Sequence, residues 1–306
     1  MILEQIASMF LVMLVEVLPF MITGIILSSI IRVFASTELL IKIFPENGIR
    51  GIIIAMFGGL LFPICECAIV PIAARLIKKG VPLHIAIIFM LSSPIINPIV
   101  IASTYYAFPN RIEMVIYRVI FGLIIALVTG IIIKIKNFKL EEVLINIEQD
   151  HLSTCNCEHC SSTPFSNEKK VLGKMRQVFF YASEEFFEAG KYLIIGILLT
   201  SVIQNIVPKS IFYKISNLSF IQQLIMMAIS FIFSICSTSD AFVAKSFIGS
   251  FSYSSIMAFL VFGPMLDLKN IFMLSSSLKK KFIVQYVTIL TVVSICLLFI
   301  LTLLFM

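Results

Sequence analysis

Long uninterrupted apolar runs restrict most strongly what this chain can fold into. Eight such segments lie at about 3–33, 51–78, 83–107, 112–134, 179–207, 220–248, 253–275 and 282–306. A helix needs roughly 20 apolar residues to cross a bilayer core. Only 13% of the 306 residues are charged, against about 25% in ordinary soluble domains. Because the runs also lack the short alternation of membrane barrels, the sequence predicts an all-α polytopic membrane protein in a lipid bilayer.

A polar stretch divides the segments four and four. We expect three regions: a first membrane repeat at 1–135, a cytoplasmic cysteine-containing loop at 136–177, and a second membrane repeat at 178–306. The net charge of +6 predicts no nucleic-acid partner, because Lys and Arg in membrane proteins chiefly set orientation.

The two halves resemble each other in sequence. Residues 16–31 align with 188–203 at an offset of 172, with seven of 16 pairs identical, among them Glu16/Glu188 and Gly24/Gly196. Cys65 aligns with Cys236 at an offset of 171, and further matches follow at 170. Shared helix composition explains the Ile and Leu matches but not a Glu, a Cys and a Pro in register. Internal repeats in a membrane protein favour a transporter.

The distribution of Lys and Arg favours inverted over parallel repeats. If all eight segments cross, ten Lys/Arg lie in cytoplasmic loops and nine outside, contrary to the positive-inside tendency. If segments 2 and 6 (51–78 and 220–248) are re-entrant hairpins, 16 lie inside and three outside. The hairpin tips then approach the midplane from opposite faces. Parallel repeats are the alternative.

The two predicted hairpin tips carry thiols beside carboxylates. A carboxylate at membrane depth is costly and usually marks a pathway or binding site. Thiolates select soft ions, and trivalent arsenic also bonds to sulfur. The tips contribute these predicted substrate-binding residues: Cys65, Glu66, Cys67, Cys236, Ser237, Thr238 and Asp240. The alternative is that the cysteines are small buried hydrophobes.

The third and seventh segments share a proline followed by a polar residue. Pro94 precedes Asn97, and Pro264 precedes Asp267 at matching positions. Proline removes a backbone donor, and irregular backbone is tolerated in a membrane where it is buried in protein or lines a cavity. We expect paired discontinuous helices around a central site, with Asn97 and Asp267 contacting substrate. A plain proline kink is the alternative.

Two further features have predicted roles. Glu16 and Glu188 lie within apolar segments and are candidates for proton coupling, or else for a structural hydrogen bond between helices. The loop 136–177 contains a tentative metal site with these residues: Cys155, Cys157, His159 and Cys160. Its C-x-C-x-x-C spacing is not a strong zinc signature, and a linker that happens to carry thiols is the alternative.

The runs PICECAIVPIAARLIKKGVPLHIAIIFMLSSPIINPIVIAST and ICSTSDAFVAKSF resemble the predicted permease family that includes ArsP-type organoarsenical exporters. This resemblance implies a permease of the cell membrane, and in some members export of trivalent organoarsenicals. It carries no residue roles to this chain.

These observations predict a permease rather than an enzyme. It moves a small molecule or ion by alternating access, possesses no cofactor, and in one reading exports a thiophilic species. The first alternative is a permease or channel for a small anion or metal ion, in which the cysteines are structural. The second is a membrane thiol oxidoreductase in which the Cys65/Cys67 pair exchanges electrons with the loop cysteines. The sequence does not specify an oligomeric state.

Overall fold

The computed structural model describes residues 2–34, 40, 42, 44–45, 49–61, 66–109, 111–145, 167–206, 219–249 and 251–305. Apart from two isolated β-bridges, the regular structure in these residues is helical, which confirms the predicted all-α class. The helices are α1 (Ile2–Phe34), α3 (Ile49–Leu61), α4 (Glu66–Lys78), α5 (Leu83–Ile96), α6 (Pro98–Ala107), α7 (Ile112–Lys136), α8 (Leu140–Val143), α9 (Asn167–Ile206), α10 (Ser219–Phe233), α11 (Asp240–Lys245), α12 (Tyr253–Met265), α13 (Leu268–Ser277) and α14 (Lys280–Phe305).

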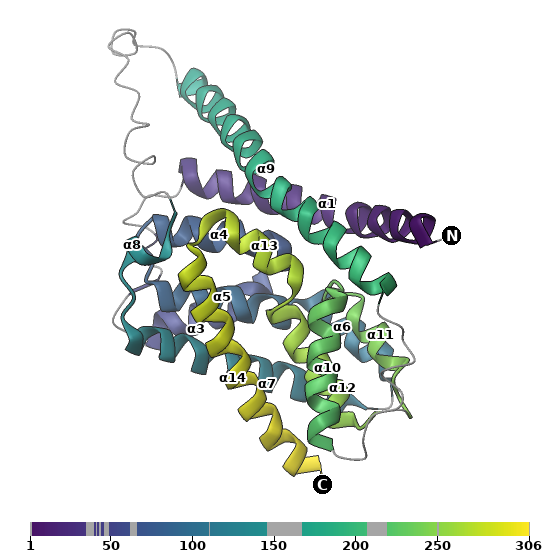
Figure 1. Ribbon diagram of the computed structural model, residues 1–306. Coiled ribbons are helices and arrows are strands. Elements are labelled where there is room, and N and C mark those ends of the chain that lie inside the picture. Colours follow the sequence, from purple (N-terminus) through teal and green to yellow (C-terminus); the bar gives the residue numbers. More distant parts are fainter. Residues whose placement is uncertain are drawn as a thin grey trace.

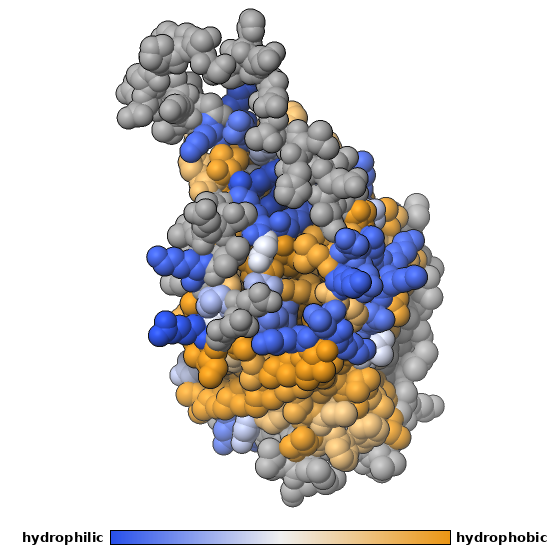
Figure 2. All heavy atoms as spheres, turned by 90° about the vertical axis from the view of Figure 1, so that its left-hand side faces the viewer, coloured by the Kyte–Doolittle hydropathy of each residue, from blue (hydrophilic) through white to orange (hydrophobic). Residues whose placement is uncertain are grey.

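Five helical stretches in the described part of the chain are long and apolar enough to cross a membrane, and a sixth is added if α5 and α6 form one bent span. The five are α1, α7, α9, α14 and the stretch Tyr253–Ser277, which contains α12 and α13. The predicted segments 51–78 and 220–248 each form two short helices instead, α3 with α4 and α10 with α11. Figure 2 shows apolar side chains gathered in a broad band beside a hydrophilic region, as expected for a protein in a bilayer.

The centre of the bundle is formed by α5 and α12, which pack against each other. All residues of α5 from His84 to Ile96 are buried, and so are those of α12 from Ser254 to Met265. A helix that is apolar on every side is stable only when other helices surround it. Here α3, α4 and α7 surround α5, while α10, α7 and α14 surround α12.

The long helices α1 and α9 cross each other on one side of this bundle (Figure 1). Helix α1 also packs on α4, and α9 packs on α13. Gly24 makes the close contact between α1 and α4 possible, because a Cβ at this position would collide with the backbone and side chain of Ala68 in α4. Small residues such as glycine allow two helices in a membrane to approach closely.

Two helices of the bundle are broken at matching positions. Between α5 and α6 the backbone leaves helical geometry at Asn97, which precedes Pro98, and the two helices are bent by 40°. Between α12 and α13, Leu266 and Asp267 are extended. The breaks follow Pro94 and Pro264 rather than coinciding with them, since both prolines lie inside their helices. Pro98 ends α5 because the residue before a proline is disfavoured in helical geometry.

Candidate functional site

A buried polar group joins the two segments that were predicted to be hairpins. Glu66, the first residue of α4, is 1% exposed, and Ser237 Oγ donates a hydrogen bond of 3.0 Å to its Oε2 atom. Lys269 Nζ lies 3.7 Å from Glu66 Oε1 and 3.4 Å from Asp267 Oδ2. The structure therefore brings together three of the predicted site residues, Glu66, Ser237 and Asp267, around one lysine.

The carboxylate at the start of α11 belongs to a separate ion pair. Arg118 of α7 donates to both oxygens of Asp240, over 3.1 Å to Oδ1 and 2.5 Å to Oδ2. Arg118 also donates to Thr104 Oγ1 of α6 over 2.7 Å. Arg118 and Asp240 are 1% and 3% exposed. A buried bidentate pair of this kind is strong and directional, so the predicted site residue Asp240 fixes α6, α7 and α11 together.

Asn97 and Asp267 act first as helix caps. Asn97 Oδ1 accepts a hydrogen bond from Ile99 N over 2.9 Å at the start of α6. Asp267 Oδ1 accepts from Asn270 N over 2.6 Å at the start of α13. Side-chain oxygens at this position satisfy backbone donors that the helix itself leaves unpaired. The predicted site residue Asn97 is thus a cap of the first break, whereas Asp267 is both a cap and a neighbour of Lys269.

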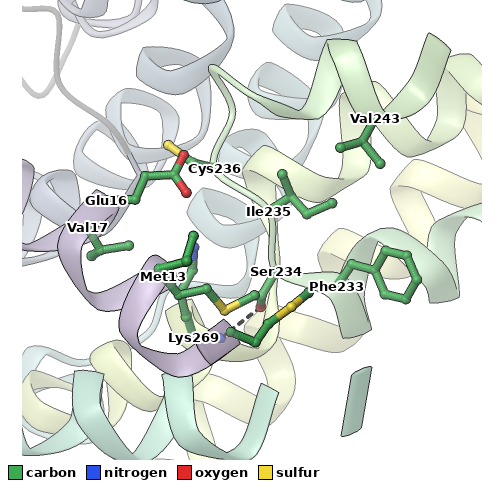
Figure 3. A pocket seen from close by; sticks show the side chains of 11 residues that line it. Met13, Glu16, Val17, Phe233, Ser234, Ile235, Cys236, Val243 and Lys269 are labelled. Atoms are coloured by element: carbon green, nitrogen blue, oxygen red, sulfur yellow. Dashed lines mark hydrogen bonds between the residues drawn. The ribbon is translucent and has the colours of Figure 1, made fainter. Parts of the chain in front are cut away.

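A cavity of about 300 Å³ lies between α1 and the connection from α10 to α11. Its wall includes Met9, Met13 and Glu16 of α1, together with Cys236, Val243 and Lys269 (Figure 3). The cavity thus combines soft sulfur atoms with one carboxylate and one ammonium group. Such a mixture of apolar lining and a few polar groups is typical of small-molecule sites.

The connection from α10 to α11 shapes this cavity. Ser234 has a positive φ of 47°, and its Oγ accepts a hydrogen bond from Lys269 N over 3.3 Å. A non-glycine residue in this conformation is strained and is held in place by its surroundings. Thr238 Oγ1 donates to Cys236 Sγ over 3.5 Å, and Ser239 Oγ donates to Glu16 Oε1 over 2.7 Å. The last bond is the structural contact that was one of the two alternatives for Glu16.

Several predicted site residues lie outside what the structure describes. This is true of Cys65 and of the loop residues Cys155, Cys157, His159 and Cys160. Cys67 and Glu188 lie in helices, but their side chains are outside the description. Within the described part of the chain, no group of three or more His, Cys, Asp or Glu residues is arranged to hold a metal ion.

The sequence predictions gave no site role to Lys269 and Arg118. Both lie within predicted apolar segments, 112–134 and 253–275, and in the described residues they are the cations of two buried ion-pair groups. The signal was available, because an ionisable residue inside a membrane segment is a functional candidate by default. The thioethers of Met9 and Met13 gave no such signal, since methionine is common in every apolar run.

Comparisons with known proteins agree with the resemblance in the sequence. The family model ArsP_1, described as a predicted permease, matches residues 2–303. The chain is 40% identical over 289 residues to the UPF0718 protein YcgR of Bacillus subtilis, covering 94% of each chain. It is 36% identical over 283 residues to a Streptococcus mutans protein named "Putative two-component membrane permease complex subunit", covering 92% of this chain and 90% of that one. No solved structure matches.

Family and fold agree on the class of protein. The match covers nearly the whole chain, and the five or six apolar spans fit a multi-pass protein of the cell membrane. The chain therefore belongs to the ArsP_1 family of predicted permeases.

Proposed function

We propose that this permease exports a small thiophilic solute, such as a trivalent organoarsenical, through the 300 Å³ cavity beside α1. The observation that carries the proposal is the position of Cys236 in the wall of a cavity that Met9 and Met13 also line. Sulfur ligands select soft ions. Trivalent arsenic forms bonds to thiol sulfur, and neighbouring thioethers offer it a polarizable apolar wall.

The polar groups of the cavity have separate tasks. Cys236 contacts the solute, Glu16 offers a carboxylate, and Lys269 connects the cavity to Glu66. Thr238, which donates a hydrogen bond to Cys236 Sγ, stays a predicted contact. Cys65 and Cys67 stay predicted contacts. Asn97 and Asp240 are supporting residues, because they cap α6 and pair with Arg118 respectively. Proton coupling by Glu16 and Glu188 stays a prediction.

The transport cycle uses two inverted repeats, 1–135 and 178–306, joined by the cytoplasmic stretch 136–177, with segments 2 and 6 re-entrant. Two observations support this architecture. Each half contains, in order, a long helix, two short helices, a broken pair and a further long helix. If segments 2 and 6 do not cross the membrane, six of the eight apolar segments do. The described residues contain the same number of possible spans when α5 and α6 are counted as one span. One repeat then moves against the other to give alternating access.

A small anion is the second candidate solute. The observation in its favour is Lys269, a buried cation in the cavity wall. In this version the thiol of Cys236 is packing, and the hydroxyl groups of the α10–α11 connection bind the solute. The Streptococcus mutans relative is named as a subunit of a two-component complex, so this chain is further expected to work with a second membrane protein.

Everted membrane vesicles test the thiophilic site. Uptake of methylarsenite is compared between the native chain, Cys236→Ser and Cys296→Ser. Cys236 is buried at the cavity whereas Cys296 is exposed on α14, so both variants make the same chemical change at different places. Transport by Cys236→Ser is expected to fall about tenfold or more, the equivalent of about 1.4 kcal/mol of lost binding. Cys296→Ser is expected to behave as the native chain.

The outcomes separate the two solutes. Equal methylarsenite transport by both variants would remove Cys236 from the site and with it the thiophilic solute. If arsenate or phosphate uptake is then lost in Lys269→Met but kept in Cys236→Ser, the anion version is the correct one.

A further inference from the structure

A second and much smaller cavity lies beside Glu66, away from the solute cavity. Its volume is about 10 Å³, enough for one particle the size of a water molecule. Every residue that lines it is buried, and they come from α4, α5, α12, α13 and α14. Three of them carry polar side chains: Glu66, Asn270 and Tyr286.

The three polar side chains share one property. Glu66 Oε1, Asn270 Oδ1 and Tyr286 Oη are all buried, and none has a hydrogen-bond partner in the described structure. The exposed fractions of these residues are 1%, 5% and 1%. Buried polar atoms are almost always paired, and leaving one unpaired is costly. Of these three oxygens, only Glu66 Oε1 has an ion pair within the described residues, with Lys269 at 3.7 Å, and the three residues line one small cavity. This arrangement indicates an occupant that binds them.

The charge around the cavity indicates the sign of that occupant. Glu66 and Asp267 contribute two negative charges, and Lys269 contributes one positive charge between them. If both carboxylates are ionised, one negative charge is left without compensation. Pro264 and Met265, at the C-terminal end of α12, also line the cavity. The last carbonyl groups of a helix form its negative end, whereas Glu66 and Asn270 lie at the positive N-terminal ends of α4 and α13. The excess carboxylate charge, rather than the helix ends, therefore favours a cation.

We propose that this cavity binds one monovalent cation, Na⁺, through the oxygens of Glu66, Asn270 and Tyr286. Oxygen ligands suit hard cations. A single charge balances the excess of one carboxylate. Mg²⁺ would leave a positive excess, and it usually keeps several waters, for which a cavity of about 10 Å³ has no room. A water molecule also fits by size, but it leaves the excess negative charge in place.

Lys269 connects this cation site to the solute cavity. Its side chain reaches Glu66 and Asp267 and is also part of the wall of the larger cavity. Na⁺ at Glu66 competes with Lys269 for the same oxygen, so the lysine charge acts more strongly on the solute cavity when the ion is bound. The cation site stands on its own geometry, and only this coupling to transport rests on the proposed function.

Direct binding tests the site in the full-length protein purified in detergent. Binding of ²²Na⁺ is measured in choline chloride for the native chain and for Tyr286→Phe, which removes one oxygen and little volume. Tyr192→Phe, at a half-exposed position on α9, is the matched control. The native chain and the control are expected to bind Na⁺, and Tyr286→Phe to bind it at least tenfold more weakly.

Thermal unfolding gives a second readout on the same samples. Na⁺ at ten times its dissociation constant is expected to raise the unfolding midpoint of the native chain by about 2 °C relative to choline. Tyr286→Phe loses this dependence. If the cavity holds only water, the native chain shows no Na⁺ binding and no Na⁺-dependent shift of its unfolding midpoint. That result, or saturation by Ca²⁺ or Mg²⁺ in place of Na⁺, overturns the proposal.

A transport experiment distinguishes failure of the proposed cation site from failure of the proposed function. Vesicle transport is measured with Na⁺ or choline on both sides for the native chain and Tyr286→Phe. Faster transport in Na⁺ that disappears in Tyr286→Phe supports the coupling through Lys269. Na⁺ binding without any effect on transport supports the cation site and rejects its coupling to transport. If the native chain binds Na⁺ but does not transport methylarsenite, the proposed solute is rejected and the cation site is not.

Discussion

The two broken helices are alike where they break and differ in how their second halves are held. In both, a polar side chain caps the helix that follows the break, Asn97 for α6 and Asp267 for α13. The residue two positions after the cap differs between the two halves of the chain. It is Ile99, 47% exposed, in the first half and Lys269, 1% exposed, in the second. The same local backbone device therefore serves as a plain break in one half and as part of an ion site in the other.

The contacts that hold α6 and α13, the helices after the two breaks, also differ. Helix α6 is tied by Thr104 to the bidentate pair of Arg118 and Asp240, with distances of 2.5–3.1 Å. Helix α13 is tied by Lys269, whose distances to two carboxylates are 3.4 and 3.7 Å. Short, directional bonds fix geometry, whereas a point charge at longer range permits exchange with an ion. The comparison indicates a rigid support in the first half and an adjustable site in the second.

Removing the rigid support is expected to have the largest effect on stability. Arg118→Met leaves Asp240 as an unpaired buried charge, which costs about 3–5 kcal/mol. Unfolding in detergent is compared with Arg50→Met, the same change at an exposed position. The double variant with Asp240→Asn is expected to lose less than the sum of the single ones. A loss no greater than that of Arg50→Met would show that the pair does not anchor α6.

Removing the adjustable charge is expected to have an intermediate effect. Lys269→Met leaves Glu66 and Asp267 without their common cation and is expected to cost about 1.5–3 kcal/mol. Lys280→Met, at an exposed position, is the control. If the longer distances at Lys269 do mark the weaker anchor, Lys269→Met is less destabilising than Arg118→Met while transport is lost. The reverse order of stability would break the distinction between the two halves.

The caps are expected to have the smallest effects and to separate backbone from charge. Asn97→Ala removes only a cap and is expected to cost about 1 kcal/mol. Asp267→Asn keeps a capping oxygen but removes the charge, so its effect should fall on Na⁺ binding more than on the unfolding midpoint. Asp267→Ala loses both. Equal loss of Na⁺ binding in Asn97→Ala and Asp267→Asn would mean that the two breaks are functionally equivalent.

The sequence predicted local features well. The helical class and the breaks after Pro94 and Pro264 agree with the structure. Glu66 and Ser237, from the two segments predicted to be hairpins, are in contact. It did not predict which cation each carboxylate faces. Asp240 was assigned to the solute site, yet its oxygens face Arg118. Arg118 and Asp240 are 122 residues apart in the sequence. A pattern within one segment cannot show that two such distant residues meet.

The amino-acid sequence by itself determined that this chain is a membrane protein with broken helices. Apolar length decides whether a segment remains in a bilayer, and proline and capping residues decide where a helix ends, so both are local properties. Only the tertiary structure decided that Lys269 lies between Glu66 and Asp267 and that Cys236 lines the same cavity as Glu16. These relations depend on how α1, α4 and α13 pack, because a buried charge is stable only beside the partner that packing brings to it.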